Sequence, residues 1–164
     1  MGLQLPGELR SLLDLLGYSW PEADEEKLLE MGQAWIRFSG TLSGIVDEAN
    51  GSAAAVWSGQ QGRDIQAFQQ WWSNQESPIA NLGDGVTAAL LTGTGLIICG
   101  VIVLALKISV IVQLVILAIQ IAQAVATAVA TFGASLAEIP IFQQLARTII
   151  NNLFQEVVWQ LIDG

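Results

Sequence analysis

The feature that most constrains this chain is an apolar tract from Val86 to Ala137, which has 52 residues and a single charge, on Lys107. About 20 apolar residues cross a bilayer once, so the tract could cross twice, and a transmembrane hairpin is one interpretation. However, the tract has no Trp or Tyr belt at either end and almost no Lys/Arg bias that would set its orientation. We therefore expect long helices whose apolar surface the isolated chain cannot cover, and which either associate or enter a membrane.

This tract also has a polar side. Six Ser, Thr and Gln residues fall near one helical face: Ser109, Gln113, Gln120, Gln123, Thr127 and Thr131. Four alanines recur at every fourth position on an adjacent face: Ala122, Ala126, Ala130 and Ala134. Glutamine amides can hydrogen-bond across a helix interface, and small residues let two helices approach closely. We therefore expect the polar stripe of Gln113, Gln120 and Gln123 to face another helix, with a water-filled pore as the alternative.

Charge is distributed unevenly along the chain. Residues 1–85 hold 12 of the 15 acids and 4 of the 6 bases, a net charge of −8, whereas the remainder has a net charge of −1. This division predicts an acidic helical head over residues 1–85 and an apolar helical region over residues 86–164. The total of −9 argues against a nucleic-acid partner and against docking on anionic lipid by charge.

The residue types exclude most chemistry. The chain has no histidine and one cysteine, Cys99, so it can form no internal disulfide, no cysteine metal cluster and no His-based nucleophile. Cys99 lies in an apolar run and is expected to be a small buried hydrophobe. The acids around Asp24 lack the spacing of a calcium loop and suit the positive end of a helix. We expect no cofactor, no metal and no enzymatic activity, and Met1 to Leu16 does not form a secretory signal peptide.

A Trp-x-Gly turn, Trp57-Ser58-Gly59, separates two amphipathic segments. Before it, apolar or small residues recur in steps of three and four, on one helical face: Leu28, Met31, Trp35, Phe38, Leu42, Ile45 and Ala49. After it, three residues keep this spacing: Ile65, Phe68 and Trp72. The pattern predicts an antiparallel hairpin of helices over about residues 21–55 and 60–76, packed along these stripes. Gly59 is expected to end the first helix with a positive φ, and Trp57 to be buried between the helices.

Further helices are predicted on either side of this hairpin. Residues 5–17 form an amphipathic segment that ends at Gly17, and a final amphipathic helix begins at Pro140. Ser77-Pro78 should break the second hairpin helix, with turn chemistry over residues 79–85. The long hairpin helix is interrupted by glycines that we interpret as contact points for a neighbouring helix: Gly32, Gly40, Gly44 and Gly51. The whole pattern predicts an all-α helical bundle.

The tryptophans are expected to pack rather than to bind a ligand. Trp35 lies on the predicted seam and Trp57 at the turn, which makes both core or interface residues. Trp71 and Trp72 are adjacent and point about 100° apart on a helix, so they cannot share one face. One of the two should therefore lie at the edge of the core or contact a partner.

The Trp20-Pro21-Glu22-Ala23-Asp24-Glu25-Glu26 run, the following helix, the Trp57-Ser58-Gly59 turn and the aromatic residues after it resemble the Trp-x-Gly family of type VII secretion substrates. The likeness covers residues 1 to about 135 and extends to a longer subgroup. That subgroup resembles the N-terminal domain of the mycobacterial outer-membrane channel and necrotizing-toxin protein and of actinobacterial polymorphic toxins. The family's Tyr-x-x-x-Asp/Glu export signal has no match after the hairpin, because Tyr18 is the only tyrosine.

The resemblance implies an export and interaction module that pairs with another helical protein, a hairpin partner or secretion chaperone, or with itself. It also implies export by a non-classical, type VII-like route, or a place in the cell envelope. The apolar tract supports an alternative, a membrane-inserting or pore-forming helical protein. A purely structural helical bundle is the third hypothesis.

Overall fold

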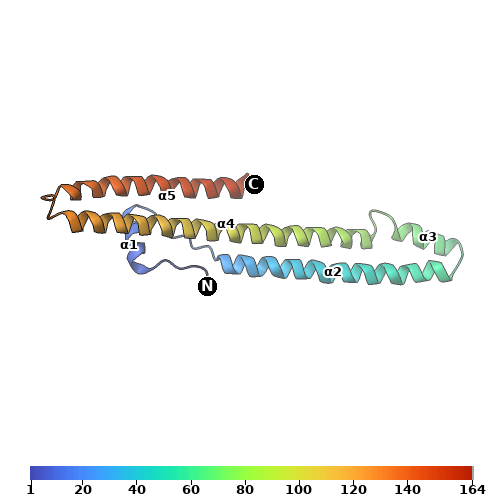
Figure 1. Ribbon diagram of the computed structural model, residues 1–164. Helices are drawn as coiled ribbons and strands as arrows, with labels where there is room; N and C mark the ends of the chain where they lie inside the picture. Colours follow the sequence, from blue (N-terminus) through green and yellow to red (C-terminus); the bar gives the residue numbers. More distant parts are fainter. Residues whose placement is uncertain (164) are drawn as a thin grey trace. The chain divides into compact units, whose positions relative to one another are not determined.

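A computed structural model describes residues 1–163, and these are all helical or irregular (Figure 1). The elements in chain order are α1 (Gly7–Leu15), α2 (Glu25–Gly59), α3 (Arg63–Trp72), α4 (Pro78–Thr127), the 3-10 helix η1 (Ala134–Glu138) and α5 (Ile139–Ile162). The predicted all-α class is confirmed.

The chain forms two compact units. The first consists of Met1–Lys27 with the described part of Cys99–Gly164, and the second is Leu28–Ile98. Both α2 and α4 contribute residues to both units. The compositional boundary at residue 85 falls inside α4, so the division into an acidic head and an apolar region stays a prediction about composition.

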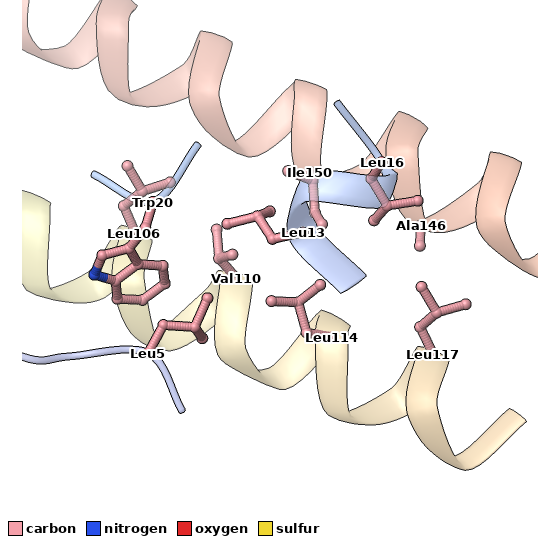
Figure 2. Packing of buried hydrophobic residues seen from close by; sticks show 10 residues of the cluster. All are labelled: Leu5, Leu13, Leu16, Trp20, Leu106, Val110, Leu114, Leu117, Ala146 and Ile150. Atoms are coloured by element: carbon pink, nitrogen blue, oxygen red, sulfur yellow. The ribbon is translucent and has the colours of Figure 1, made fainter. Parts of the chain in front are cut away.

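The core of the first unit lies between α1, α4 and α5. Leu13 of α1 points between α4 and α5, toward Val110, Leu114 and Ile150 (Figure 2). These four side chains and Leu117 have no exposed surface at all. Burial of a Leu, Ile or Val side chain contributes about 1.5–3 kcal/mol, so this cluster is the main apolar anchor of the short helix α1.

The predicted ends of the first helix are close to those observed. Pro6 is the residue before α1, and Gly17 adopts a positive φ of 85°, which ends the helix as expected. The backbone N–H of Tyr18 then donates to the carbonyl of Leu13 at 3.2 Å. The Tyr18 ring stacks on Phe154 of α5, with ring centroids 5.7 Å apart. The turn at Gly17 therefore delivers the chain onto α5.

In the second unit, α2 packs against the first part of α4 through small residues. A Cβ added to Gly32 would lie 2.7 Å from the carbonyl oxygen of Gly93, and one added to Gly93 would lie 2.6 Å from that of Gly32. Ser39, Ala53 and Ala89 are also buried. The α2–α4 seam is therefore a close backbone approach rather than a layer of large side chains. Of the predicted glycine contacts, only Gly32 is confirmed: Gly40, Gly44 and Gly51 have open space beside them.

The second hairpin helix ends before Ser77-Pro78, as predicted, but Pro78 starts the long helix α4, so the prediction of a turn over residues 79–85 was wrong. The Ser77 hydroxyl accepts a hydrogen bond from the N–H of Ala80 at 3.2 Å, which is the interaction of an N-cap residue. Pro78 is the first residue of α4, where its missing N–H removes no helical hydrogen bond. Similarly, α2 begins at Glu25 and not at Pro21, and the Asp24 carboxylate accepts from the N–H of Lys27 at 3.0 Å.

The long helix ends before the apolar tract does. α4 ends at Thr127, and the backbone reverses at Phe132 and Gly133, which have positive φ values of 53° and 84°. Ala130 and Thr131 therefore lie beyond the helix on which they were expected. The final helix is confirmed, with Pro140 in its first turn. Its buried face is centred on Ala146 and Ile150.

Candidate interaction surface

The large apolar residues of α2 form an exposed stripe. Met31, Trp35, Phe38 and Ile45 are 45%, 40%, 51% and 50% exposed, respectively. The sequence pattern made these residues the packing seam of the hairpin, and that prediction was wrong. We call these four residues the α2 stripe.

The reason lies in side-chain size and helix geometry. Consecutive residues on a helix point about 100° apart, so Phe38 faces away from its buried neighbour Ser39, and Met31 from Gly32. A seam through Gly32 and Ser39 brings two backbones close together, which no seam through Trp35 and Phe38 would allow. The close approach fixes the small residues inside and leaves the aromatic residues outside.

Two aromatic residues of the α2 stripe form a hollow. Trp35 and Phe38 meet edge to face, with ring centroids 5.9 Å apart and planes at 82°. Together with Ala34 they line an open cavity of about 300 Å³. A shallow apolar hollow between two rings suits insertion of an apolar side chain from a partner helix, because buried aromatic anchors dominate interface energies.

An aromatic cluster joins the end of α2 to α3. Phe68 is its centre, with ring centroids 5.9 Å from Trp57, 6.2 Å from Trp71 and 5.7 Å from Trp72. The indole N–H of Trp72 donates to the side-chain oxygen of Asn50 at 2.8 Å. Trp57 pairs with Phe68 and Asn50 with Trp72, so the predicted antiparallel course of α2 and α3 is confirmed.

The cluster differs from the predicted turn in two respects. Trp57 is only half-buried, and Gly59 is the last residue of α2, without a positive φ. Gly62 instead takes the positive φ, 153°, immediately before α3. Trp71 is 52% exposed whereas Trp72 is half-buried, so Trp71 is the member of the pair at the edge.

The three glutamines of the polar stripe of α4 differ in exposure. Gln113 and Gln120 are half-buried, and Gln123 is exposed. Within residues 1–163, none of the three amide side chains has a hydrogen-bond partner, and Ala122 and Ala126 beside them are exposed. Its assignment to a helix interface with a partner stays a prediction.

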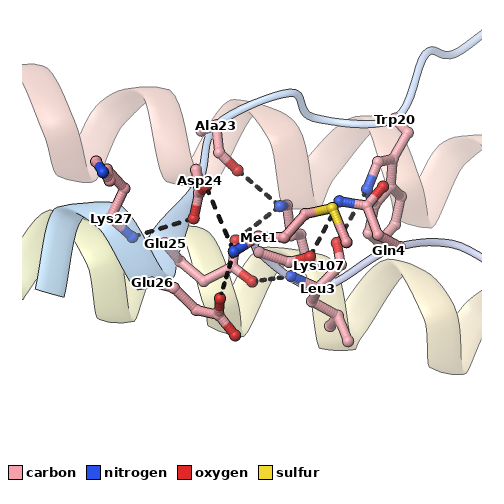
Figure 3. Close-up of polar contacts among 11 residues, drawn as sticks. Met1, Leu3, Gln4, Trp20, Ala23, Asp24, Glu25, Glu26, Lys27 and Lys107 are labelled. Atoms are coloured by element: carbon pink, nitrogen blue, oxygen red, sulfur yellow. Dashed lines mark hydrogen bonds and ion pairs between the residues drawn. The ribbon is translucent and has the colours of Figure 1, made fainter. Parts of the chain in front are cut away.

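Glu25 and Lys107 form a buried ion pair in the first unit, which no sequence pattern predicted. Lys107 Nζ lies 2.7 Å from Glu25 Oε2 and donates to the carbonyl of Ala23 at 2.6 Å (Figure 3). The other carboxylate oxygen of Glu25 accepts from the N–H of Leu3. Lys107 also lies 5.8 Å from the centre of the Trp20 ring. The signal for this pair was the single charge in the apolar tract, because a buried ammonium needs an anion.

Opposing effects act on the Glu25 carboxyl. Burial by itself raises the pKa of Glu25, but the hydrogen bonds from Lys107 and from the Leu3 N–H favour the carboxylate, and its pKa lies below the ordinary value. The ion pair therefore ties the start of α2 to the middle of α4 at neutral pH.

The described residues offer no arrangement suited to metal binding: residues 1–163 contain no cluster of three His, Cys, Asp or Glu side chains. Cys99 is a free thiol and is half-buried, which is more exposed than predicted.

Comparison with known proteins gives one family. A family model described as "WXG100 like domain" matches residues 6–149, most of the chain of 164 residues. No curated protein matches the chain. No solved structure matches it either.

Proposed function

Because the chain belongs to the WXG100-like domain family, we propose that it is a non-catalytic export and interaction module of type VII secretion. Membership of the family associates the chain with this export route. The finer proposal is that it acts like the N-terminal trafficking domain of secreted polymorphic toxins, in which an apolar helical region follows the hairpin. Secretion by this route, or retention in the cell envelope, is the corresponding location.

The observation that carries the proposal is the exposed α2 stripe. Four large apolar side chains on one helix face water in the isolated chain, and two of them form a hollow. Exposed apolar patches of this kind mark interaction sites in soluble proteins. A helix of a partner protein would cover the α2 stripe by placing an apolar side chain between Trp35 and Phe38.

The aromatic cluster gives the hairpin a second contact point. Trp71 exposes half of its surface although Phe68 and Trp72 hold it in place. A rigid, exposed Trp loses little conformational freedom on binding and is a common anchor at interfaces. The chain has no Tyr-x-x-x-Asp/Glu signal after the hairpin, so we propose that its partner supplies the signal for export.

Secretion tests the proposal directly. The chain, carrying an epitope tag, is expressed in an actinobacterium with an intact type VII system and in one that lacks the ATPase of that system. We expect the tagged chain in the medium or envelope of the first strain and its retention in the cytoplasm of the second. Equal export by the two strains would refute the proposal.

A membrane-inserting protein is the second candidate, and α4 is the observation in its favour. The helix has 50 residues, its most apolar window has a mean hydropathy of 2.8, and only 33% of that window is buried. By length and composition it could therefore cross a bilayer. Resistance of the chain to carbonate extraction, with leakage of dye from liposomes, would favour this candidate over the export module.

A further inference from the structure

The part of α4 that lies in the first unit has a second apolar face, opposite its core. Eight residues in alternating steps of four and three are all apolar and all exposed: Val101, Ala105, Ile108, Val112, Val115, Ile119, Ala122 and Ala126. The buried residues of the same helix, including Val110 and Leu114, point the other way. We call this face the α4 stripe, and it covers about 38 Å of helix at about 1.5 Å per residue.

The spacing of the α4 stripe is that of a helix–helix seam. A strict period of 3.5 residues keeps a face in contact with another helix along its whole length, whereas contact with lipid does not require this period. The side chains are alanine, valine and isoleucine, which allow close approach and lose little rotamer freedom on burial. The exposed side chain of Gln123, four residues after Ile119, lies at the edge of the stripe, where it suits the rim of a protein contact better than hydrocarbon.

The stripe is also symmetric about its own midpoint, which lies between Val112 and Val115. Ile108 and Ile119 are equally distant from this midpoint, as are Ala105 and Ala122. In an isologous two-fold contact, residue i faces residue j and residue j faces residue i. An antiparallel pair of α4 helices would therefore place every residue of the stripe opposite a stripe residue of a second copy, with like side chains facing across the inner layers.

Charge distinguishes the antiparallel pair from a parallel one. The stripe has no charged residue. One acid beside it is Glu156 of α5, which lines a hollow together with Ala105, and further acids precede and follow Glu25, which is held at Lys107: Glu22, Asp24 and Glu26. A parallel pair would bring the two sets of acids together. An antiparallel pair places the two Lys107 positions 13 residues apart along the axis. This is about 20 Å and is longer than a Debye length of about 8–10 Å.

From the spacing, the symmetry and the placement of charge, we propose that the α4 stripe is the contact between two copies of this chain, which pair antiparallel about a two-fold axis between Val112 and Val115. This surface is separate from the α2 stripe and does not depend on the secretion assignment.

Sedimentation of the full chain tests the association. We expect a dimer for the wild type and a monomer for Val112→Asp with Val115→Asp, because four like charges meet at the axis. The dissociation constant should rise by about 100-fold or more. Val125→Asp is the matched control: Val125 is exposed on the same helix but lies off the stripe, so this variant should stay dimeric. A monomeric wild type, or a dimer unaffected by the double substitution, would overturn the proposal.

Disulfide trapping tests the direction of the pair without relying on stability. In a Cys99→Ser background, copies with Ile108→Cys are mixed with copies with Ile119→Cys and oxidised. We expect disulfides between the two kinds of copy and not between two Ile108→Cys copies, whose cysteines would lie about 16 Å apart along the axis, too far for a bond. Self-linked Ile108→Cys copies would contradict the antiparallel arrangement. Val125→Cys in place of Ile119→Cys is the control and should not link.

Neutral phosphatidylcholine vesicles distinguish a second copy from lipid. We expect the dimer not to float with these vesicles. Flotation of the wild type that is lost in Val112→Asp with Val115→Asp, together with a monomeric state in buffer, would assign the stripe to lipid and overturn the proposal.

Discussion

Lys107 on α4 is paired with Glu25 at the start of α2, and the two side chains are only 2% and 3% exposed. The single charge of the apolar tract is therefore neutralised inside the fold. Desolvation of two charges opposes such a pair, and only good geometry with additional hydrogen bonds offsets it. The bonds from Leu3 to Glu25 and from Lys107 to Ala23 supply that geometry.

Removal of one partner should be more harmful than removal of both. We expect Glu25→Ala to lower the free energy of unfolding by about 3–5 kcal/mol, because it leaves a buried ammonium without an anion. Glu25→Leu with Lys107→Met should be markedly more stable than that single variant. Urea unfolding of the two variants and the wild type measures this. A double variant no more stable than Glu25→Ala would show that the pair is not coupled as described.

Acid should weaken the first unit through Glu25. Its pKa is lowered in the folded chain, so its contribution is complete above the unfolded pKa of about 4.3 and is lost as pH falls through the folded value. Urea midpoints measured between about pH 7 and about pH 3 should therefore fall more steeply for the wild type than for Glu25→Gln. Glu22→Gln, which removes an exposed acid, is the control. Identical profiles for the wild type and Glu25→Gln would contradict the role of the pair.

Two glycines of α2 should respond to alanine in opposite directions. In Gly32→Ala, the new Cβ would meet the backbone of α4, so overpacking should lower the free energy of unfolding by about 1–3 kcal/mol. The higher helix propensity of alanine offsets up to about 1 kcal/mol of this loss. At Gly40 there is open space, so Gly40→Ala should stabilise by up to about 1 kcal/mol. Thermal unfolding of both variants measures the difference. Stabilisation by Gly32→Ala would argue against the close approach.

The adjacent tryptophans of α3 should separate stability from binding. Trp72 is half-buried and bonded to Asn50, so Trp72→Ala should lower stability, by less than the roughly 3–5 kcal/mol of a fully buried Trp. Trp71→Ala should change stability by only about 0.5 kcal/mol, because half of its surface is already exposed. Chemical unfolding checks both values, and equal losses for the two variants would contradict the assigned geometry.

The sequence allowed prediction of the helical class, the end of the first helix at Gly17 and the antiparallel course of α2 and α3. These features follow from local periodicity and from glycine geometry. The prediction that the α2 stripe is the packing seam of the hairpin was wrong. A regular apolar spacing shows that residues share one face of a helix, but it does not show whether this chain or a partner covers that face. The glycines of α2 did indicate a close helix contact, and Gly32 makes one. The sequence alone does not show which small residues form the seam, since the energy of the seam comes from close backbone approach rather than from large apolar area.

Two other features were not predicted correctly from the sequence, for similar reasons. Ser77-Pro78 is compatible with both a break and a helix start, and the bond from Ala80 to the Ser77 hydroxyl decides between them. The pairing of Glu25 with Lys107 joins residues 82 positions apart, which no local pattern encodes. Long-range contacts of this kind become visible only once the elements are packed.

Secretion of a variant of the α2 stripe tests most directly the central claim that this stripe is recognised for export. In the strain with an intact type VII system, we expect Trp35→Ser with Phe38→Ser to remain in the cytoplasm while its unfolding curve stays close to that of the wild type. Ile141→Ser with Leu145→Ser, which removes two apolar side chains of α5 that are more exposed than Trp35 and Phe38, should be exported normally. Normal export of the Trp35→Ser, Phe38→Ser variant would contradict the account, because the α2 stripe would then have no part in recognition.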